Sequence, residues 1–384
     1  MRNTLGVAIL TACLTLCWLS VRPFRFAAEG LSRIFHGGRQ EANLEQTYRE
    51  TATQEVTKGE APLSGLRRLG ARWSTAEELK RLVFIGNSQT YTVVLAPDER
   101  VPNTPPKTYV DLLADRTAAE GWSVYRLSAP NLSYAEALWY VTYLCSVAEV
   151  RPTEIVLQLN YQSFRLTGIR DGMLELLEEA RFARMIDEPA GSSAPYAAVM
   201  AQAKRRYMER KRERTGNREG RRTSDDGYGK RAERNLREWL NTQPVWTAKH
   251  ATKADILDFL YLSRVYFLGI KPTTRRPLGG SYGMSLACLD GVAAKCRANG
   301  IVLKLFLAPQ NPKAQLWRTE SDRSQYRTGA RTIADQYGLA LVDLENVVPS
   351  RDWGAWIDGP DPIHFGLEGH RLMAEAVLRS DLVR

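Results

Sequence analysis

Short, continuous apolar runs that alternate with longer helical segments most strongly constrain the fold of this chain. The runs lie at 82–86, 122–127, 154–160, 301–308 and 339–344, and helical periodicity occurs at 108–121, 133–150, 284–299, 318–337 and 366–378. Continuous apolar runs are typical of strands buried on both faces, and helices between such strands are typical of parallel sheets. The pattern therefore predicts an α/β fold in which helices cover both faces of a mainly parallel sheet.

The length of the chain, 384 residues, allows one large domain with an insertion or two domains. We expect a signal peptide or N-terminal membrane anchor at 1–26, a linker or surface layer at 27–73, and an α/β domain at 74–384. A charged, mostly helical insertion at about 166–275 interrupts this domain between its third and fourth strands.

The N-terminal segment has the composition of a targeting sequence. Residues 3–21 carry no charge, while Arg2 precedes them and Arg22 comes directly after. Roughly 17 strongly apolar residues are near the lower limit for spanning a bilayer, and the lack of a clear small-x-small cleavage site favours an uncleaved anchor. Basic residues after the segment argue against export of the C-terminal part, whereas a short leading apolar segment usually directs the rest of the chain to export. We expect a membrane-anchored, extracytoplasmic protein, either periplasmic or at the cell surface.

Positive charge is concentrated in one segment. The net charge is +10, and the residues from Lys204 to Arg237 contain 14 Lys/Arg and 6 Asp/Glu. A solvated helical arm or a disordered insert explains such a run, and a contact with an anionic polymer or with lipid head groups is the alternative. Nucleic-acid binding is disfavoured, because only Tyr207 and Tyr228 are interleaved with these charges.

The five cysteines indicate neither a disulfide framework nor a metal site. They form no CxxC motif, and no Cys/His cluster has the spacing of zinc ligands. Cys288 and Cys296 lie eight residues apart in a helical pattern, as packed apolar residues would. We therefore expect no metal and no organic cofactor.

A serine lies just beyond the first predicted strand. The stretch LVFIGNSQT, residues 82–90, ends its apolar run on Gly86 and places Ser88 at the carboxyl end of the strand. Ligands of open α/β sheets bind at this edge. A nucleophilic serine needs a base, and the base needs an acceptor that orients it. His364, with Asp361 three residues before it in DPIH, supplies such a pair, although a loop histidine before a helix is more often a surface or capping residue.

Asparagines come after two other predicted strands. Asn160 ends IVLQLN, and Asn131 lies in SAPNLS after the second strand. A side-chain or backbone N–H at these positions could donate to an oxyanion. The alternative for both is turn chemistry, because asparagine is common where strands stop. His370, on the helix after the DPIH motif, is expected to be structural.

This order of motifs resembles the SGNH/GDSL hydrolase superfamily, over roughly residues 80–165 and 300–380. The resemblance implies a three-layer, flavodoxin-like fold with Ser88 as nucleophile, His364 as base and Asp361 as its orienting acid. It also implies an oxyanion hole from Ser88, Asn160 and a second-block residue.

The sequence departs from the family pattern at three places. Asn87 replaces the aspartate of the first block, and Leu159 and Tyr161 flank Asn160 where the third block usually has glycine and aspartate. The second-block glycine is missing, and Asn131 is the best substitute because asparagine tolerates positive φ.

The resemblance implies a serine esterase or an O-acyltransferase that acts on an acetyl ester of a cell-envelope polysaccharide or a similar acylated substrate. A membrane-bound O-acyltransferase is a possible partner of such an anchored protein. Tyr91, Tyr161, Trp353 and Trp356 could stack on sugar rings, but aromatic residues near loops are more often core. The alternative function is a catalytically silent binding or assembly module that contacts an anionic polymer or membrane through the basic segment.

Overall fold

The computed structural model describes residues 49–50, 66–67, 69–71, 73, 80–95, 106–186, 194–222, 278–313, 319–356 and 359–383. The chain divides into two compact units, of which one comprises 46–211 and 275–384 and contains the sheet. The predicted anchor at 1–26 lies outside the described residues, as does the basic segment after Arg222. Within the described part, no helix has both the length and the apolar character needed to cross a bilayer.

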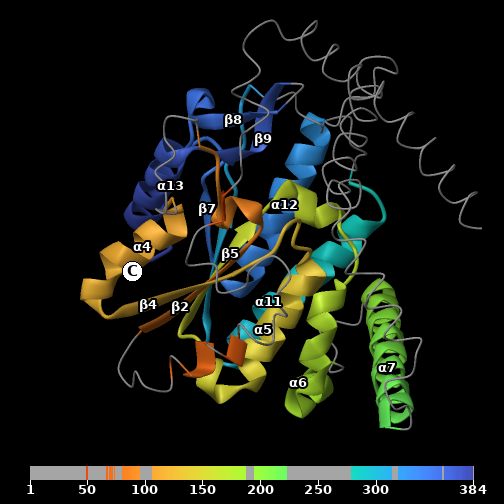
Figure 1. The fold of residues 1–384 in the computed structure, drawn as a ribbon. Coiled ribbons are helices and arrows are strands. Elements are labelled where there is room, and N and C mark those ends of the chain that lie inside the picture. Colours follow the sequence, from red (N-terminus) through yellow and green to blue (C-terminus); the bar gives the residue numbers. More distant parts are fainter. Residues whose placement is uncertain are drawn as a thin grey trace, which may run out of the picture. The chain divides into compact units, whose positions relative to one another are not determined.

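Five parallel strands form the central sheet (Figure 1). In spatial order they are β4 (Trp122–Ser128), β2 (Lys80–Gly86), β5 (Glu154–Leu159), β6 (Val302–Leu307) and β7 (Ala340–Asp343). Numbered along the chain, this order is 2-1-3-4-5, the flavodoxin-like arrangement. All five strands were predicted as apolar runs, and the predicted parallel sheet is confirmed.

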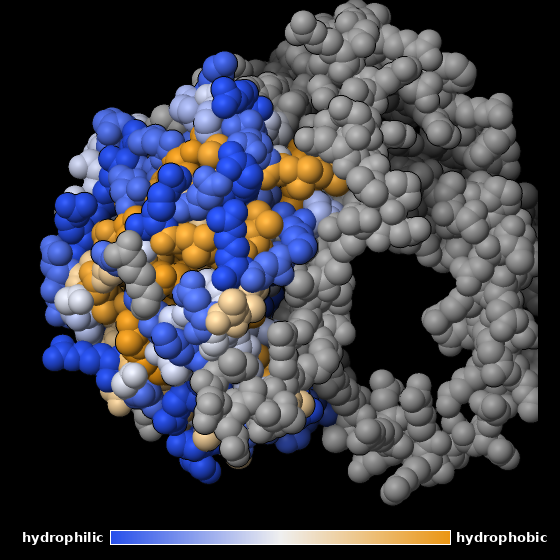
Figure 2. All heavy atoms as spheres, turned by 90° about the vertical axis from the view of Figure 1, so that its left-hand side faces the viewer, coloured by the Kyte–Doolittle hydropathy of each residue, from blue (hydrophilic) through white to orange (hydrophobic). Residues whose placement is uncertain are grey.

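Helices cover both faces of the sheet, so the fold has three layers. One face packs against α5 (Tyr134–Ser146), α11 (Ser281–Ala298) and α12 (Glu320–Tyr337), and the other against α4 (Tyr109–Thr117) and α13 (Leu367–Arg379). Alternate residues of each strand enter the two cores: Val83 and Ile85 join the first, whereas Leu82 and Phe84 join the second. Hydrophilic side chains cover most of the described surface over α4 and α13, and apolar side chains show between them (Figure 2).

Side-chain caps fix where three of these helices begin. Thr108, Ser133 and Thr319 each form a capping box with the acidic residue three positions later. Such reciprocal bonds satisfy N–H groups that have no partner within the helix. The predicted helix 133–150 is shorter than expected, because α5 ends at Ser146 and a 3₁₀ turn, η4 (Ala148–Val150), comes after it.

Residues of the predicted insertion pack on the main core. The described part contains η6 (Asp171–Glu178), α6 (Ala180–Met185) and α7 (Ala194–Arg222). Met173 and Phe182 are buried in the core beside α5 and α11, and Met200 anchors the start of α7 there. The described part of the insertion up to Lys211 therefore belongs to the same compact unit as the sheet.

The compact unit begins earlier than the predicted boundary at residue 74. Leu66, Leu69 and Trp73 fall in the segment expected to be a linker or surface layer, yet all three are buried in the core. Trp73 Nε1 donates to Ser123 Oγ on β4 at 2.9 Å. Leu66, Leu69 and Trp73 stand at positions i, i+3 and i+7, the spacing of one face of a helix, so the sequence carried a short helical signal in this segment.

Candidate active site

Ser88 lies directly beyond the carboxyl end of β2, at the start of the 3₁₀ turn η1 (Ser88–Thr90). Asn87 caps this turn, since its Oδ1 accepts from Gln89 N at 3.0 Å. A Cβ at Gly86 would overlap Thr90 Cγ2 and lie 2.7 Å from Gln158 Oε1. Glycine is therefore required here by the close approach of two side chains.

The described structure places Asp361 and His364 on a strand, where a loop was predicted. They lie in β9 (Gly359–Phe365), which forms an antiparallel hairpin with β8 (Trp353–Trp356) outside the main sheet. The prolines and glycines of this segment indicate a loop in the sequence. Pairing with β8 and packing of Phe365 and Trp353 in the core make it extended instead.

Hydrogen bonds join Ser88, His364 and Asp361 in series. His364 Nε2 lies 2.8 Å from Ser88 Oγ, and His364 Nδ1 lies 3.0 Å from Asp361 Oδ2. An ionised carboxylate only accepts, so Nδ1 carries the proton of the neutral imidazole and Nε2 is left to accept from the serine hydroxyl. This arrangement is that of a nucleophile, its base and an orienting acid.

Asp361 is held as a carboxylate in a buried position, with an exposed side-chain fraction of 0%. Its Oδ1 accepts from Ile363 N at 2.7 Å and from His364 N at 3.0 Å. Burial alone would raise its pKa, but hydrogen bonding and charge from His364, with the two backbone N–H groups, outweigh this, so the pKa lies below its usual value. Asn311, which sequence reasoning missed, donates to Asp361 O at 2.9 Å.

The two predicted oxyanion asparagines lie beyond β4 and β5. Asn131 has φ 50°, the one positive φ among non-glycine residues of the described chain. The backbone at Asn131 therefore has the left-handed conformation that favours glycine. The asparagine that replaces the second-block glycine of the family pattern still allows this conformation. Asn160 Oδ1 accepts from Gln162 N at 2.9 Å. No hydrogen bond between described residues links either asparagine to Ser88, and their role stays a prediction.

An ion pair fixes the loop that carries Asn131. Arg170 Nε and Nη2 each lie 2.7 Å from one carboxylate oxygen of Glu136, and Nη2 also donates to Pro130 O at 3.0 Å. The carbonyl of Pro130 and the N–H of Asn131 belong to one trans peptide and point in opposite directions. Arg170 thereby fixes the direction in which the Asn131 N–H points.

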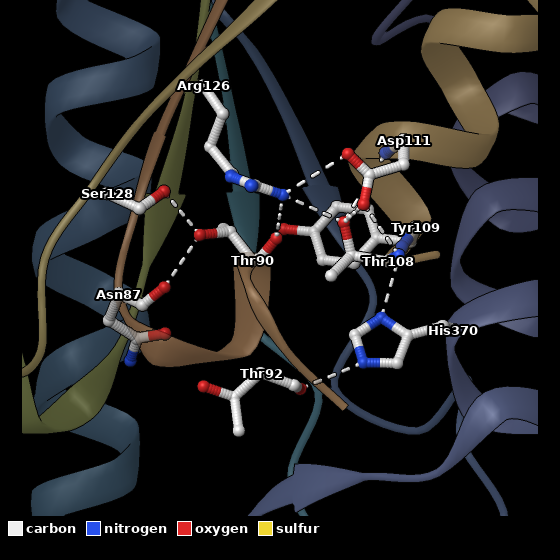
Figure 3. Close-up of polar contacts among 9 residues, drawn as sticks. All are labelled: Asn87, Thr90, Thr92, Thr108, Tyr109, Asp111, Arg126, Ser128 and His370. Atoms are coloured by element: carbon white, nitrogen blue, oxygen red, sulfur yellow. Dashed lines mark hydrogen bonds and ion pairs between the residues drawn. The ribbon is translucent and has the colours of Figure 1, made fainter. Parts of the chain in front are cut away.

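A buried polar network lies behind the serine turn (Figure 3). Arg126 on β4 points toward Thr90, Thr108 and Asp111; its Nη1 donates to Thr90 O and to Thr108 Oγ1 at 3.0 Å each. Its ion pair with Asp111 Oδ1 measures 3.5 Å. Thr90 Oγ1 in turn donates to Asn87 O at 2.7 Å. The guanidinium therefore holds the C-terminal end of the turn that begins with Ser88.

His370, on α13, is fully buried and bridges two backbone segments. Its Nδ1 accepts from Tyr109 N at 3.1 Å and its Nε2 donates to Thr92 O at 3.0 Å (Figure 3). An amide N–H only donates and a carbonyl only accepts, so both contacts need the neutral ring. Burial, opposed by the Thr92 carbonyl, lowers the pKa of His370 to about 3. These contacts agree with the expectation that His370 has a structural role.

The free energy of unfolding is expected to fall as the pH drops from 6.5 toward 3. The unfolded chain protonates His370 near 6.5, whereas the folded protein does so only at about 3, so the unfolded state binds more protons in this window. At about 1.4 kcal/mol per pKa unit, the loss reaches on the order of 4 kcal/mol. Urea unfolding between about pH 4.5 and 6.5 measures this slope. His370→Gln should flatten it, and equal slopes would contradict the assignment.

The aromatic residues that could have stacked on sugar rings and the three described cysteines are buried in the core, except for Trp356, whose side chain is not described. Tyr91, Tyr161 and Trp353 are buried, which favours packing over sugar stacking, and the Trp356 side chain lies outside the described residues. Burial raises the pKa of Cys145 to about 11 and that of Cys288 to about 12, and the pKa of Cys296 is raised as well. These thiols are therefore poor nucleophiles at neutral pH.

Several residues that support the serine turn or the Asp361 backbone were missed at the level of sequence. They are Gln89, Thr108, Asp111, Arg126, Gln158 and Asn311. The one signal in the sequence was a polar residue inside an apolar strand, as with Arg126 in WSVYRL and Gln158 in IVLQLN. A polar group buried in a sheet needs hydrogen-bond partners, but the pattern does not show which partners these are.

No protein-family model and no curated protein sequence matches this chain. Solved structures resemble it at low sequence identity. The psychrotrophic esterase EstA from Pseudoalteromonas sp., inhibited by monoethylphosphonate, is 10% identical with a TM-score of 0.36, over 78% of this chain and 96% of EstA. A variant of Axe2, an acetyl xylan esterase from Geobacillus stearothermophilus, is 12% identical with a TM-score of 0.36, over 78% of this chain and 93% of Axe2. LAE5, an alpha/beta hydrolase enzyme from the metagenome of Lake Arreo, is 14% identical with a TM-score of 0.37, over 78% of this chain and 93% of LAE5.

The structure agrees with the sequence analysis in the order of the site residues, strands and helices along the chain. Ser88 comes after the first strand of the sheet, and the Asp361–His364 pair precedes the last helix, α13. The strands have the order 2-1-3-4-5 with helices on both faces. The chain therefore has the three-layer, flavodoxin-like α/β fold that was expected from its sequence.

Proposed function

We propose that the protein is a serine-dependent acyl-ester hydrolase or O-acyltransferase. The observation that carries the proposal is the hydrogen-bonded series from Ser88 Oγ through the His364 imidazole to the buried Asp361 carboxylate. Closeness in the sequence does not explain this contact, since Ser88 and His364 are 276 residues apart. Serine and imidazole at hydrogen-bond distance, with the imidazole oriented by a carboxylate, suit acyl transfer through a covalent intermediate.

The geometry supports a two-step mechanism. In the first step Ser88 Oγ attacks the ester carbonyl carbon while His364 Nε2 takes the hydroxyl proton. The tetrahedral intermediate collapses when His364 gives this proton to the alkoxide oxygen of the leaving alcohol, which leaves an acyl ester on Ser88. In the second step His364 takes a proton from water or from an acceptor hydroxyl, whose oxygen attacks the acyl carbon. The proton then returns to Ser88 Oγ as the free serine is restored.

Asp361 acts through the imidazole. Its carboxylate accepts from Nδ1 and so keeps Nε2 directed at the serine, and it stabilises the positive ring formed in each step. The proposed oxyanion donors are the backbone N–H of Ser88 with groups of Asn131 and Asn160. Hydrogen bonds to the developing oxyanion are a large part of catalysis in such sites.

The proposed substrate is an acetyl ester of a cell-envelope polysaccharide, with transfer to a sugar hydroxyl as the alternative to hydrolysis. Its support is the sequence resemblance together with the uncharged segment at 3–21. On the same basis we propose a membrane-anchored, extracytoplasmic location, and a membrane-bound O-acyltransferase as partner.

Covalent trapping tests the proposal directly. A fluorophosphonate forms a stable adduct with a serine only when a neighbouring base activates its hydroxyl. We expect one adduct per protein, on the peptide that contains Ser88, when the labelled protein is digested and analysed by mass spectrometry. The labelling should be lost in His364→Ala and kept in Ser324→Ala, which changes an exposed serine of α12. Labelling at another serine, or equal labelling without His364, would exclude the proposed mechanism.

A further inference from the structure

Gln89, the residue after Ser88, is almost completely buried, with an exposed fraction of 1%. Its Nε2 donates to Ile363 O at 2.7 Å and to Pro309 O at 2.9 Å. Its Oε1 accepts from Gln158 Nε2 at 2.7 Å. One side chain thus connects the serine turn to β5, to the segment after β6 and to the strand that carries His364.

Gln158 closes this connection back to the serine turn. Its Oε1 accepts from Asn87 N at 2.9 Å. A backbone N–H only donates, so this contact fixes the oxygen of Gln158 and leaves its Nε2 to donate to Gln89. The nitrogen of Gln89 must then face the carbonyls of Ile363 and Pro309, which only accept. Backbone groups at both ends therefore determine the orientation of both amides.

Ile363 lies between the two other members of the series, Asp361 and His364. Its N–H donates to Asp361 Oδ1 and its C=O accepts from Gln89 Nε2, both at 2.7 Å. The backbone beside His364 is thus fixed on one side to the acid and on the other to the neighbour of the serine. A movement of this strand away from Gln89 would lengthen the contact between His364 Nε2 and Ser88 Oγ.

We propose that Gln89 is a positioning residue whose amide, oriented by Gln158, sets the distance between His364 and Ser88. The inference rests on the proposed function, in which that distance governs both proton transfers. A displacement of about 1 Å between reacting groups can lower a rate by about 10²-fold. Loss of Gln89 Nε2 also leaves two buried carbonyls without their donor, which favours a shift of the strand.

Two substitutions of Gln89 separate its hydrogen bonds from its volume. Gln89→Glu keeps the shape and can still accept from Gln158, but its carboxylate cannot donate to either carbonyl. Gln89→Met keeps the length without charge or hydrogen bonds, and serves if the glutamate variant does not fold. Gln325→Glu is the matched control, because Gln325 is exposed on α12.

For a small chromogenic acetyl ester, we expect both Gln89 variants to lower kcat by about 10²-fold with KM changed by less than roughly threefold. Gln325→Glu should behave as wild type. Ser88→Ala, measured in parallel, gives the rate without the nucleophile. If wild type far exceeds Ser88→Ala while the Gln89 variants match wild type in kcat, the inference on Gln89 is wrong and the proposed function stands.

A spectroscopic measurement tests the inference even without turnover. The chain has 4 histidines, so ring ¹⁵N signals of the histidine-labelled protein can be assigned by single substitutions. We expect the Nε2 signal of His364 to change in Gln89→Met, because its hydrogen bond with Ser88 lengthens, while the His370 signals stay as in wild type. If wild type equals Ser88→Ala in rate, the proposed function fails. If the His364 signal is unchanged in Gln89→Met, the positioning role fails.

Discussion

Replacing Ser88 by alanine is expected to lower kcat/KM for a small acetyl ester by about 10⁴-fold or more, to the residual rate that substrate binding and the oxyanion donors alone support. The hydroxyl is the group that forms the acyl intermediate, and it lies 2.8 Å from the nitrogen that takes its proton, His364 Nε2. The fall should appear in kcat and not in KM, because the substitution removes the nucleophile and leaves the substrate-binding surface unchanged. Initial rates over a range of ester concentrations measure it.

His364→Ala should reduce the rate to the same floor, and the double variant should be no slower than either single one. Residues that act as a unit show such non-additive losses, because removal of one makes the other useless. Ser324→Ala, on the exposed face of α12, should keep the wild-type rate. If the two rate losses multiply in the double variant, the two residues act independently. That result would contradict the proposed series of hydrogen bonds.

Asp111→Asn is expected to lower the free energy of unfolding by about 3 to 5 kcal/mol, because it removes the negative charge that lies 3.5 Å from the buried Arg126 guanidinium. The exposed side-chain fractions of Arg126 and Asp111 are 5% and 8%. Burial lowers the pKa of Arg126 even though Asp111 opposes the shift, so the charge is costly even when paired. Urea unfolding of purified protein at neutral pH measures the change.

The double variant Arg126→Met/Asp111→Leu should be more stable than Asp111→Asn alone, since it removes the buried positive charge together with the negative charge beside it. Asp115→Asn on the same helix is the matched control. Its partner Lys107 is exposed, and we expect no resolvable change there. If Asp111→Asn and Asp115→Asn unfold at the same urea concentration, the buried pair does not stabilise the fold as the contacts indicate.

The elements of the sheet could be predicted because their signals are local. Each of the five strands is a run of apolar residues, and the caps at Thr108 and Ser133 mark where helices begin. The positions of Ser88 and of the Asp361–His364 pair came from the same local pattern, together with the resemblance of the motifs. The positive φ of Asn131 agrees with the expectation that this asparagine stands where the family has a glycine.

The sequence by itself therefore determined the type and order of the elements, and which residues were placed to form the series at the sheet edge. Only the tertiary structure decided what holds that series in place. Gln89 meets Ile363 across 274 positions of the chain, and Arg126 meets Thr90 across 36. The hairpin that carries His364 also formed against a sequence that indicated a loop. A buried polar side chain must find a partner, but the partner is chosen by how distant segments pack, and no local periodicity records that choice.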